Sequence, residues 1–164
     1  MEKMYPDRET RLQLICPRGG LMQLRDFVKD GELRRLAMLD ANGEECFIVV
    51  KNGAGTGLTF GRACGIEAFV RDYNEHGIKS TSMVEIAIYA YSYKDFAFSA
   101  PGDSGSVIGD ANNRIVGMIT GGSGKNDFMD VTYASPYCFL DERIKMAFPN
   151  SYLYPIQAIP KSIP

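Results

Sequence analysis

The residues of this sequence that could do chemistry are concentrated in one short segment, Ser99 to Ile108, which reads SAPGDSGSVI. Glycines at 102 and 105 allow backbone dihedral angles that other residues avoid, so this segment favours a tight turn. Such a turn directs the N–H groups of Gly102 and Ser104 to one side, where they could bind an acyl oxyanion next to the Ser104 hydroxyl. The predicted chemistry is acyl transfer, although Gly, Asp and Ser are also common in turns that have no catalytic role.

A serine hydroxyl is a weak nucleophile and needs a neighbouring base, usually a histidine that is oriented by a carboxylate. The sequence has one histidine, His76, in the polar stretch YNEHGIK. Its simplest interpretation is a solvated loop residue. The alternative, that His76 reaches Ser104 with a nearby carboxylate as its partner, makes it a weak candidate base.

The other reactive side chains do not form a recognisable site. Lys94 or Lys125 could act as the base of a Ser–Lys dyad, but nothing in the sequence places either one near Ser104. The four cysteines have no CxxC or CxxH spacing, so neither a metal site nor a cofactor is expected. We expect the cysteines to be reduced and to act as small hydrophobic residues rather than as nucleophiles.

Composition and charge exclude several classes of partner. The chain has 164 residues, with 45% hydrophobic and 23% charged residues, as is ordinary for one globular domain. The net charge of −2 and the absence of a basic run favour neither nucleic acid nor an anionic membrane. The N-terminus does not resemble a signal peptide, and no segment approaches the ~18 apolar residues of a membrane span. The compartment stays unknown, with an intracellular location as the default.

The elements that must position Ser104 are predicted to be short strands. From Asp40 onward, β-branched and aromatic runs alternate with glycines, a pattern typical of an all-β barrel. The polar stretch RDYNEHGIKSTS, residues 71–82, is expected to be a loop. The predicted strands are Cys46–Lys51, Thr56–Ile66, Met83–Tyr91, Gly105–Ile108, Arg114–Thr120 and Asp130–Ala134, followed by a helix near Tyr137–Ala147.

Two flanking segments differ from the predicted barrel domain, which covers residues 44–148. Residues 1–43 are predicted to be an arm or linker that is partly helical. Gly31 interrupts its apolar stripe and so favours one or two short helices. Residues 149–164 form a proline-rich tail, expected to be extended. The stripe consists of Leu21, Leu24, Val28, Leu33, Leu36 and Leu39.

Four ordered landmarks carry a family resemblance: VVKNGAGTGLTFGRACGI, APGDSGS, RIVGMITGG, and VTYASP followed by a helix. Their order and spacing are similar to those of trypsin-like (chymotrypsin-fold) serine peptidases, in particular disulfide-poor fungal and bacterial hypothetical trypsin-like proteins. The resemblance covers residues 44–148 and implies an all-β fold. The expected architecture is a six-stranded antiparallel barrel, the second barrel of that fold, with an N-terminal helical arm and a C-terminal helix. The sequence departs from the family at Ser106, where animal trypsins have glycine, and near Ala100, where many relatives have a half-cystine.

The resemblance also implies the roles of individual residues. Ser104 would be the nucleophile, the backbone of Gly102, Asp103 and Ser104 the oxyanion hole, and Asp103 the support of that loop. The loop Lys94–Ala100 would form one wall of the specificity pocket. The strand edge that pairs with substrate and lines the other wall would be Thr120, Gly121 and Gly122.

The family places its catalytic histidine and aspartate on the first barrel, and the ~40 residues that precede residue 44 are too few for six strands. Three hypotheses follow. The chain is the C-terminal half of a serine endopeptidase, or a non-catalytic protease-like barrel that binds a peptide or protein. Otherwise it is an enzyme whose base comes from a second chain or from His76. The expected partners are a peptide or protein substrate, together with a missing first barrel or a second copy of the chain.

Overall fold

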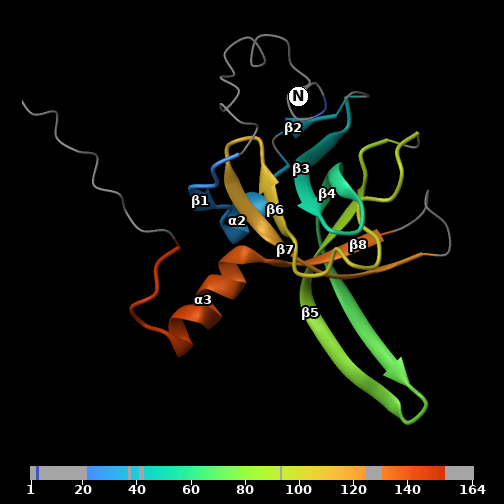
Figure 1. Ribbon diagram of the computed structural model, residues 1–164, viewed down its shortest axis with the longest axis vertical. Helices are drawn as coiled ribbons and strands as arrows, with labels where there is room; N and C mark the ends of the chain where they lie inside the picture. The colour runs from blue at the N-terminus through green and yellow to red at the C-terminus, as the bar shows by residue number, and fades with distance from the viewer. Residues whose placement is uncertain are drawn as a thin grey trace, which may run out of the picture.

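Six strands pair edge to edge in a closed ring and form an antiparallel β-barrel (Figure 1). The computed structural model describes Lys3 and residues 22–36, 38–40, 43–92, 94–124 and 131–153. The strand order around the ring is β7-β6-β3-β4-β5-β8, and β8 pairs again with β7. Within the described residues, the predicted all-β barrel is therefore confirmed.

The barrel strands agree with the predicted order, and the main differences are in their lengths. The helix that follows the last strand was predicted near residues 137–147 and has those bounds. The barrel elements are β3 Glu45–Gly53, β4 Gly57–Asn74, β5 Gly77–Ala90, β6 Val107–Asp110, β7 Arg114–Ser123, β8 Val131–Pro136 and the helix α3 Tyr137–Ala147.

Alternating side chains from these strands fill the barrel, as expected for strands with one buried face. Phe98, from the loop after β5, joins this core although it is not part of a strand. Gly61 on β4 leaves space for the Phe98 ring, because a Cβ at this position would lie 2.6 Å from the ring carbon Cδ2. The other buried members of the core are Val28, Phe47, Val49, Ala63, Ile86, Ile88, Ile108, Val116, Ile119 and Ala134.

The N-terminal arm is part of the barrel structure. The two-residue strand β1, Asp26–Phe27, pairs in parallel with the start of β7, and β2, Met38–Leu39, pairs with β3. Val28 is fully buried in the core, and its N–H donates to the carbonyl of Ile115 at 2.8 Å. The predicted helical content of the described arm is limited to the four-residue helix α2, Asp30–Leu33, and the two short strands were not predicted.

The prediction of a loop at residues 71–82 was wrong. In this region β4 and β5 continue as a two-stranded ribbon that leaves the barrel (Figure 1), with Asp72 opposite Ser80 and Asn74 opposite Gly77. The sequence of this ribbon lacks the apolar alternation by which strands with one buried face are recognised. The pairing nevertheless satisfies the backbone polar groups of both strands.

The C-terminal side of the molecule is described as far as Leu153. The remainder of the predicted proline-rich tail lies outside the described residues. None of the helices in the described part of the chain is long and apolar enough to cross a membrane.

Candidate active site around Ser104

Ser104 lies exposed on the turn that precedes β6. Gly102 and Gly105 have φ angles of 101° and 85°, in the left-handed region where glycine is favoured. Within the described residues, neither the Ser104 hydroxyl nor the N–H groups of Gly102 and Ser104 have a hydrogen-bond partner. Among the described residues, the predicted nucleophile and both predicted oxyanion donors are therefore available to an incoming group.

Strand β7 holds this turn from one side. The N–H of Gly105 donates to the carbonyl of Ile119 at 2.8 Å, and the N–H of Ile119 donates to the carbonyl of Ser106 at 3.0 Å. These two bonds fix the residues that follow Ser104 against the residue that precedes Thr120. The structure thus brings the predicted nucleophile and the predicted substrate-binding strand together.

Asp103 holds the turn in place through a buried ion pair and several hydrogen bonds. Its carboxylate is fully buried, and Oδ2 lies 3.0 Å from Nζ of Lys51, which is buried as well. The Thr56 hydroxyl donates to Oδ2 at 2.7 Å, and the N–H groups of Gly55 and Ala100 donate to Oδ1 and Oδ2 at 2.7 and 3.1 Å. Lys51 is also hydrogen-bonded to the Thr56 hydroxyl and to the Gly57 carbonyl. A buried ion pair of this kind requires full hydrogen bonding, and the surrounding donors and acceptors supply it.

The Asp103 carboxylate stays ionised in this environment. Burial on its own would raise the pKa of Asp103, but the hydrogen bond from Thr56 and the contact with Lys51 lower it, as do the N–H groups of Ala100 and Gly55. The balance holds the pKa of Asp103 well below its ordinary value. The carboxylate is therefore ionised at neutral pH, and its contacts keep the turn in one position.

Sequence reasoning missed Lys51 as part of the site. The signal was a lysine at the end of the apolar run CFIVVK, where an unpaired charge would be very unfavourable. The glycines of NGAGTG after it were given no role in the site. Two of them make room for the anchor: a Cβ on Gly53 would lie 2.8 Å from Cγ of Asp103, and one on Gly55 would lie 2.7 Å from the carbonyl of Pro101.

We expect Gly53→Ala to destabilise the protein by about 1–3 kcal/mol, because the added methyl group overlaps the Asp103 carboxylate. Chemical denaturation with a folded-state spectroscopic signal measures this change. Gly43→Ala is not a suitable control because Gly43 has a positive φ angle. Gly31→Ala is suitable, since a methyl group there has no atom within 4 Å and lies in a helix. A Gly53 variant as stable as the Gly31 variant would contradict the close approach of Asp103.

The predicted substrate strand has one edge paired and one edge without a described partner. Gly121 and Gly122 pair with Tyr133 and Thr132 on β8. On the other side of β7, the register with β6 ends at Met118, so among the described strands none continues along the other edge of residues 120–123. An extended peptide could add to an edge of this kind by backbone hydrogen bonds.

Thr120, predicted to pair with substrate, also contacts a buried carboxylate. Its hydroxyl lies 3.0 Å from Oε2 of Glu85, a buried carboxylate that sequence reasoning did not select. The register between β7 and β8 is irregular between Ile119 and Gly121, and Thr120 lies at that irregularity. The signal for Glu85 was a carboxylate within the predicted strand MVEIAIYAY, and the sequence analysis gave it no role.

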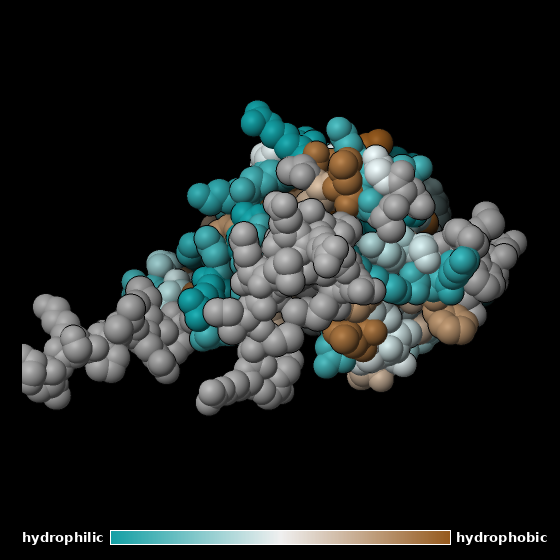
Figure 2. All heavy atoms as spheres, turned by 90° about the horizontal axis from the view of Figure 1, so that it is seen from above, coloured by the Kyte–Doolittle hydropathy of each residue, from teal (hydrophilic) through white to brown (hydrophobic). Residues whose placement is uncertain are grey.

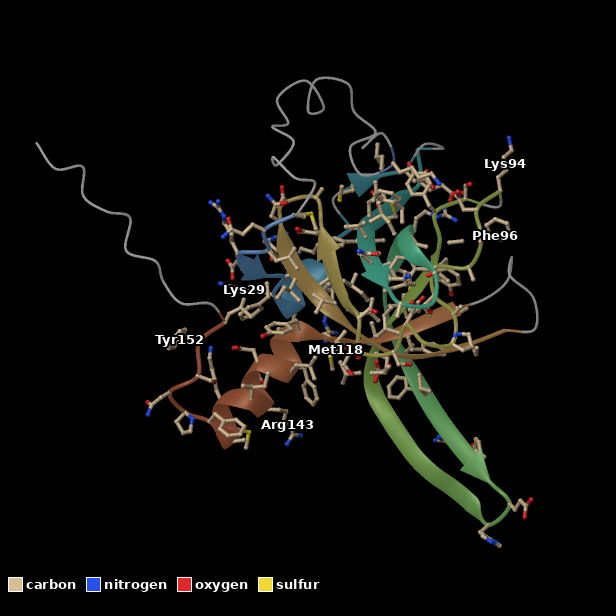
Figure 3. The ribbon with its side chains drawn as sticks, in the orientation of Figure 1. Lys29, Lys94, Phe96, Met118, Arg143 and Tyr152 are labelled. Carbon is tan, nitrogen blue, oxygen red and sulfur yellow. The ribbon has the colours of Figure 1, made fainter. Side chains whose placement is uncertain are left out.

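The loop Lys94–Ala100, expected to form a pocket wall, divides into two parts. Lys94 and Phe96 point away from the barrel into solvent (Figure 3), and Phe96 is 77% exposed. The second part turns inward, where Phe98 joins the core and the hydroxyls of Ser99 and Thr132 lie 2.7 Å apart. These contacts therefore fix the part of the loop that leads into the Ser104 turn.

The structure does not bring His76 to Ser104. His76 lies in the turn of the β4–β5 ribbon, next to Gly77, whereas β5 pairs with β8 at Ile86–Ile88. The nine residues from Gly77 to Ile86, at ~3.3 Å per residue, correspond to roughly 30 Å along the strand. Lys94 is exposed on its loop, and Lys125 lies outside the described residues.

Cysteine and metal chemistry have no site in the described residues. Cys46, Cys64 and Cys138 are free thiols, and Cys16 lies outside the described part. Burial raises the pKa of Cys46 and of Cys138, which keeps these thiols protonated at neutral pH. Over the same residues, no group of three or more His, Cys, Asp or Glu side chains is arranged to hold a metal ion.

Comparison with solved structures gives the fold a name. The chain is similar to the chymotrypsin of Cellulomonas bogoriensis, with a TM-score of 0.51 and 21% identity, over 83% of this chain and 58% of that one. A glutamic acid specific serine protease, described as using a histidine triad in substrate binding, gives a TM-score of 0.49 and 17% identity. That second match covers 82% of this chain and 56% of the other. No protein-family model and no curated protein matches the sequence.

The first likeness confirms the predicted trypsin-like fold. It extends over part of the compared enzyme, because the chain spans somewhat more than half the length of that chymotrypsin.

Proposed function

We propose that this chain is the nucleophile-bearing half of a trypsin-like serine peptidase, and that Ser104 acts when another barrel supplies its base. The observation that carries the proposal is the turn itself. It holds an exposed serine and two unengaged N–H groups on a fully buried ion pair between Asp103 and Lys51. A turn without function would not require a buried charge pair, which is expensive to desolvate.

The chemistry proposed is acyl transfer. The Ser104 hydroxyl attacks the substrate carbonyl, and the N–H groups of Gly102 and Ser104 stabilise the oxyanion. The external base takes the serine proton and returns it to the leaving amine, and water then hydrolyses the acyl-enzyme. The substrate would be a peptide or protein whose backbone pairs with the free edge of residues 120–123.

Exposed apolar side chains on two projecting elements suggest where the partner, the first barrel of the fold, would dock. Helix α3 and the β4–β5 ribbon leave the barrel on the same side and splay apart (Figure 1). The opposite end, viewed from above, has only separate apolar patches among polar residues outside the grey atoms (Figure 2). A face of this kind favours a partner domain. The exposed apolar residues of the two elements are Ile66, Phe69, Tyr73, Phe139, Ile144 and Met146.

We expect a fluorophosphonate probe to label the purified chain slowly but selectively at Ser104. In known peptidases, the oxyanion hole and substrate binding retain a rate enhancement of ~10³-fold over water when triad members are removed, and we expect the same donors to favour phosphonylation of Ser104. Intact mass and peptide mapping measure the rate and the position. Ser104→Ala should abolish the labelling, whereas Ser106→Ala, two residues away, should retain it.

Labelling distributed over surface serines at equal rates, and unchanged in Ser104→Ala, would show that the turn does not activate Ser104. The second candidate function would then be favoured, namely a non-catalytic barrel that binds peptides along β7. The observation in its favour is that the Ser104 hydroxyl has no base bonded to it among the described residues. In that case, Ser104→Ala should leave the binding of peptides from a casein digest unchanged.

A homodimer is the alternative source of a second domain. Sedimentation velocity of the purified chain at micromolar concentration distinguishes the two arrangements. A monomer would favour a separate first barrel as the partner.

A further inference from the structure

A buried carboxylate that the proposed acyl transfer does not yet use lies next to the Ser104 turn. Glu85 on β5 is 4% exposed. Thr120 on β7 donates a hydrogen bond from its hydroxyl to Oε2 at 3.0 Å, and Ser135 on β8 donates to Oε1 at 3.2 Å. Side chains from three neighbouring strands thus hold the Glu85 carboxyl group in a fixed orientation.

This group lies on the outer face of the barrel. Ile86, Ile119 and Ala134 point into the core. Each is the sequence neighbour of one of the three hydrogen-bonded residues, Glu85, Thr120 and Ser135. Because successive residues of a regular strand point to opposite faces, Glu85 and Ser135 face outward together. Thr120, at the register irregularity of β7, joins them through its hydrogen bond to Glu85. Met118 is the register partner of Ser135 and shares this outer face.

A chain of contacts links the carboxylate to the turn that carries the predicted nucleophile. Thr120 directly follows Ile119, which exchanges backbone hydrogen bonds with Gly105 and Ser106 on either side of the turn. An imidazole that bridges two groups by hydrogen bonds of ~2.8 Å joins oxygen atoms roughly 7–8 Å apart. The carboxylate and the Ser104 turn are thus connected through two consecutive residues of β7, Ile119 and Thr120.

We propose that Glu85 is a positioning residue: its carboxylate accepts the N–H of an imidazole brought by the partner barrel and orients that ring toward Ser104. This inference rests on the proposed function, because it requires Ser104 to act with an external base. The acid and the nucleophile then reside on this barrel, and the partner supplies the imidazole alone.

Imidazole is the only group that must be added for proton transfer from Ser104. The Nδ1–H of imidazole donates to Glu85, which leaves Nε2 to accept the proton of the Ser104 hydroxyl. With a fluorophosphonate, the Oγ–P bond forms, the P–F bond breaks and fluoride leaves. The serine proton remains on the imidazolium, whose charge the Glu85 carboxylate stabilises.

Free imidazole can replace the missing side chain in the test. We expect imidazole to accelerate fluorophosphonate labelling of Ser104 saturably, by about tenfold or more, as for general-base catalysis. N-methylimidazole has nearly the same basicity but no N–H for the carboxylate, so it should accelerate labelling weakly and without saturation. Glu85→Gln should abolish the difference between the two bases, each rate being compared with that of the same variant without base.

Two further variants separate positioning from folding. Glu75→Gln, at the exposed turn of the ribbon, should behave as wild type with both bases. Glu85→Asp keeps the carboxylate and should recover part of the preference for imidazole. The thermal unfolding midpoint of each variant is measured alongside, so that a misfolded Glu85→Gln protein is recognised and Glu85→Asp carries the comparison.

Equal acceleration by both bases in wild type and in Glu85→Gln would overturn the role of Glu85 while leaving the proposed function intact. If neither base accelerates labelling, the proposed function fails and the inference fails with it. Imidazole binding to the Ser104→Ala protein tests the contact with Glu85 independently of labelling. Saturable NMR shifts at Thr120 and Ser135 that disappear with Glu85→Gln show that the carboxylate binds the ring, and unchanged spectra overturn the inference.

Discussion

Replacing Lys51 by methionine is expected to lower the free energy of unfolding at pH 7 by about 3–5 kcal/mol, because it leaves the Asp103 carboxylate buried without its cation. Methionine fills a similar volume, so the change removes the charge with little loss of packing. Denaturant titration measures the difference. The position of the pair below the Ser104 turn makes this one of the two largest effects that we expect in the molecule.

The pH dependence of this difference follows from the lowered pKa of Asp103. A group whose pKa is lower in the folded state stabilises the fold above its unfolded pKa, ~3.9 for aspartate, and loses that contribution as the pH falls through the folded value. Wild type therefore loses stability progressively below pH ~4. In Lys51→Met the buried carboxylate takes up a proton more readily, so the difference between the two proteins should shrink toward acidic pH.

The matched control is Lys145→Met, which breaks an exposed ion pair with Asp141 on α3. Surface pairs contribute about 0–1 kcal/mol, so this variant should unfold close to wild type. Fluorophosphonate labelling gives a second readout, since loss of the anchor should release the turn and slow the reaction at Ser104. A Lys51→Met protein as stable as Lys145→Met would show that the pair does not carry the turn.

The strands of the barrel could be predicted from the sequence because local pattern determines them. Runs such as CFIVVK and RIVGMIT have one apolar face and are bounded by glycine or asparagine, so both order and type follow without knowledge of the partners. The same holds for α3 and for the glycines of the Ser104 turn. Their unusual φ angles are required by the local chain, and the structure has them.

The supports of the site could not be predicted because they join residues far apart in the chain. Lys51 meets Asp103, and Glu85 meets Thr120 and Ser135, through pairings that only the closed barrel creates. In a single sequence, a charge within an apolar strand shows that a partner is needed but does not identify it.

The predictions for the ribbon and for the arm were wrong for a different reason. The ribbon has no apolar alternation that would mark its strands, and the arm is held by its contacts with the barrel. Val28, for example, belongs to the core through tertiary contacts that no local pattern encodes.

Phe98→Ala is expected to destabilise the protein by about 3–5 kcal/mol, because it leaves a cavity in the core from a loop position. The ring is 1% exposed and packs on the bare backbone of Gly61. The Phe98 carbonyl accepts the hydroxyl of Thr59 at 2.7 Å, and the next residue, Ser99, is hydrogen-bonded to Thr132. Loss of the ring should therefore weaken the loop that leads into the Ser104 turn, and labelling should slow along with the loss of stability.

Phe96→Ala is the matched control, since it removes the same ring two residues earlier where the side chain is exposed to solvent. It should change the free energy of unfolding by no more than about 0.5 kcal/mol. Gly61→Ala tests the contact from the other strand, and its penalty should be smaller when combined with Phe98→Ala. The rescue is expected to be partial, because the new methyl group would also lie 2.8 Å from Cγ2 of Ile88 and 2.9 Å from the Tyr89 carbonyl. Fully additive penalties would mean that the ring and Gly61 do not meet, and that the loop is held by its hydrogen bonds alone.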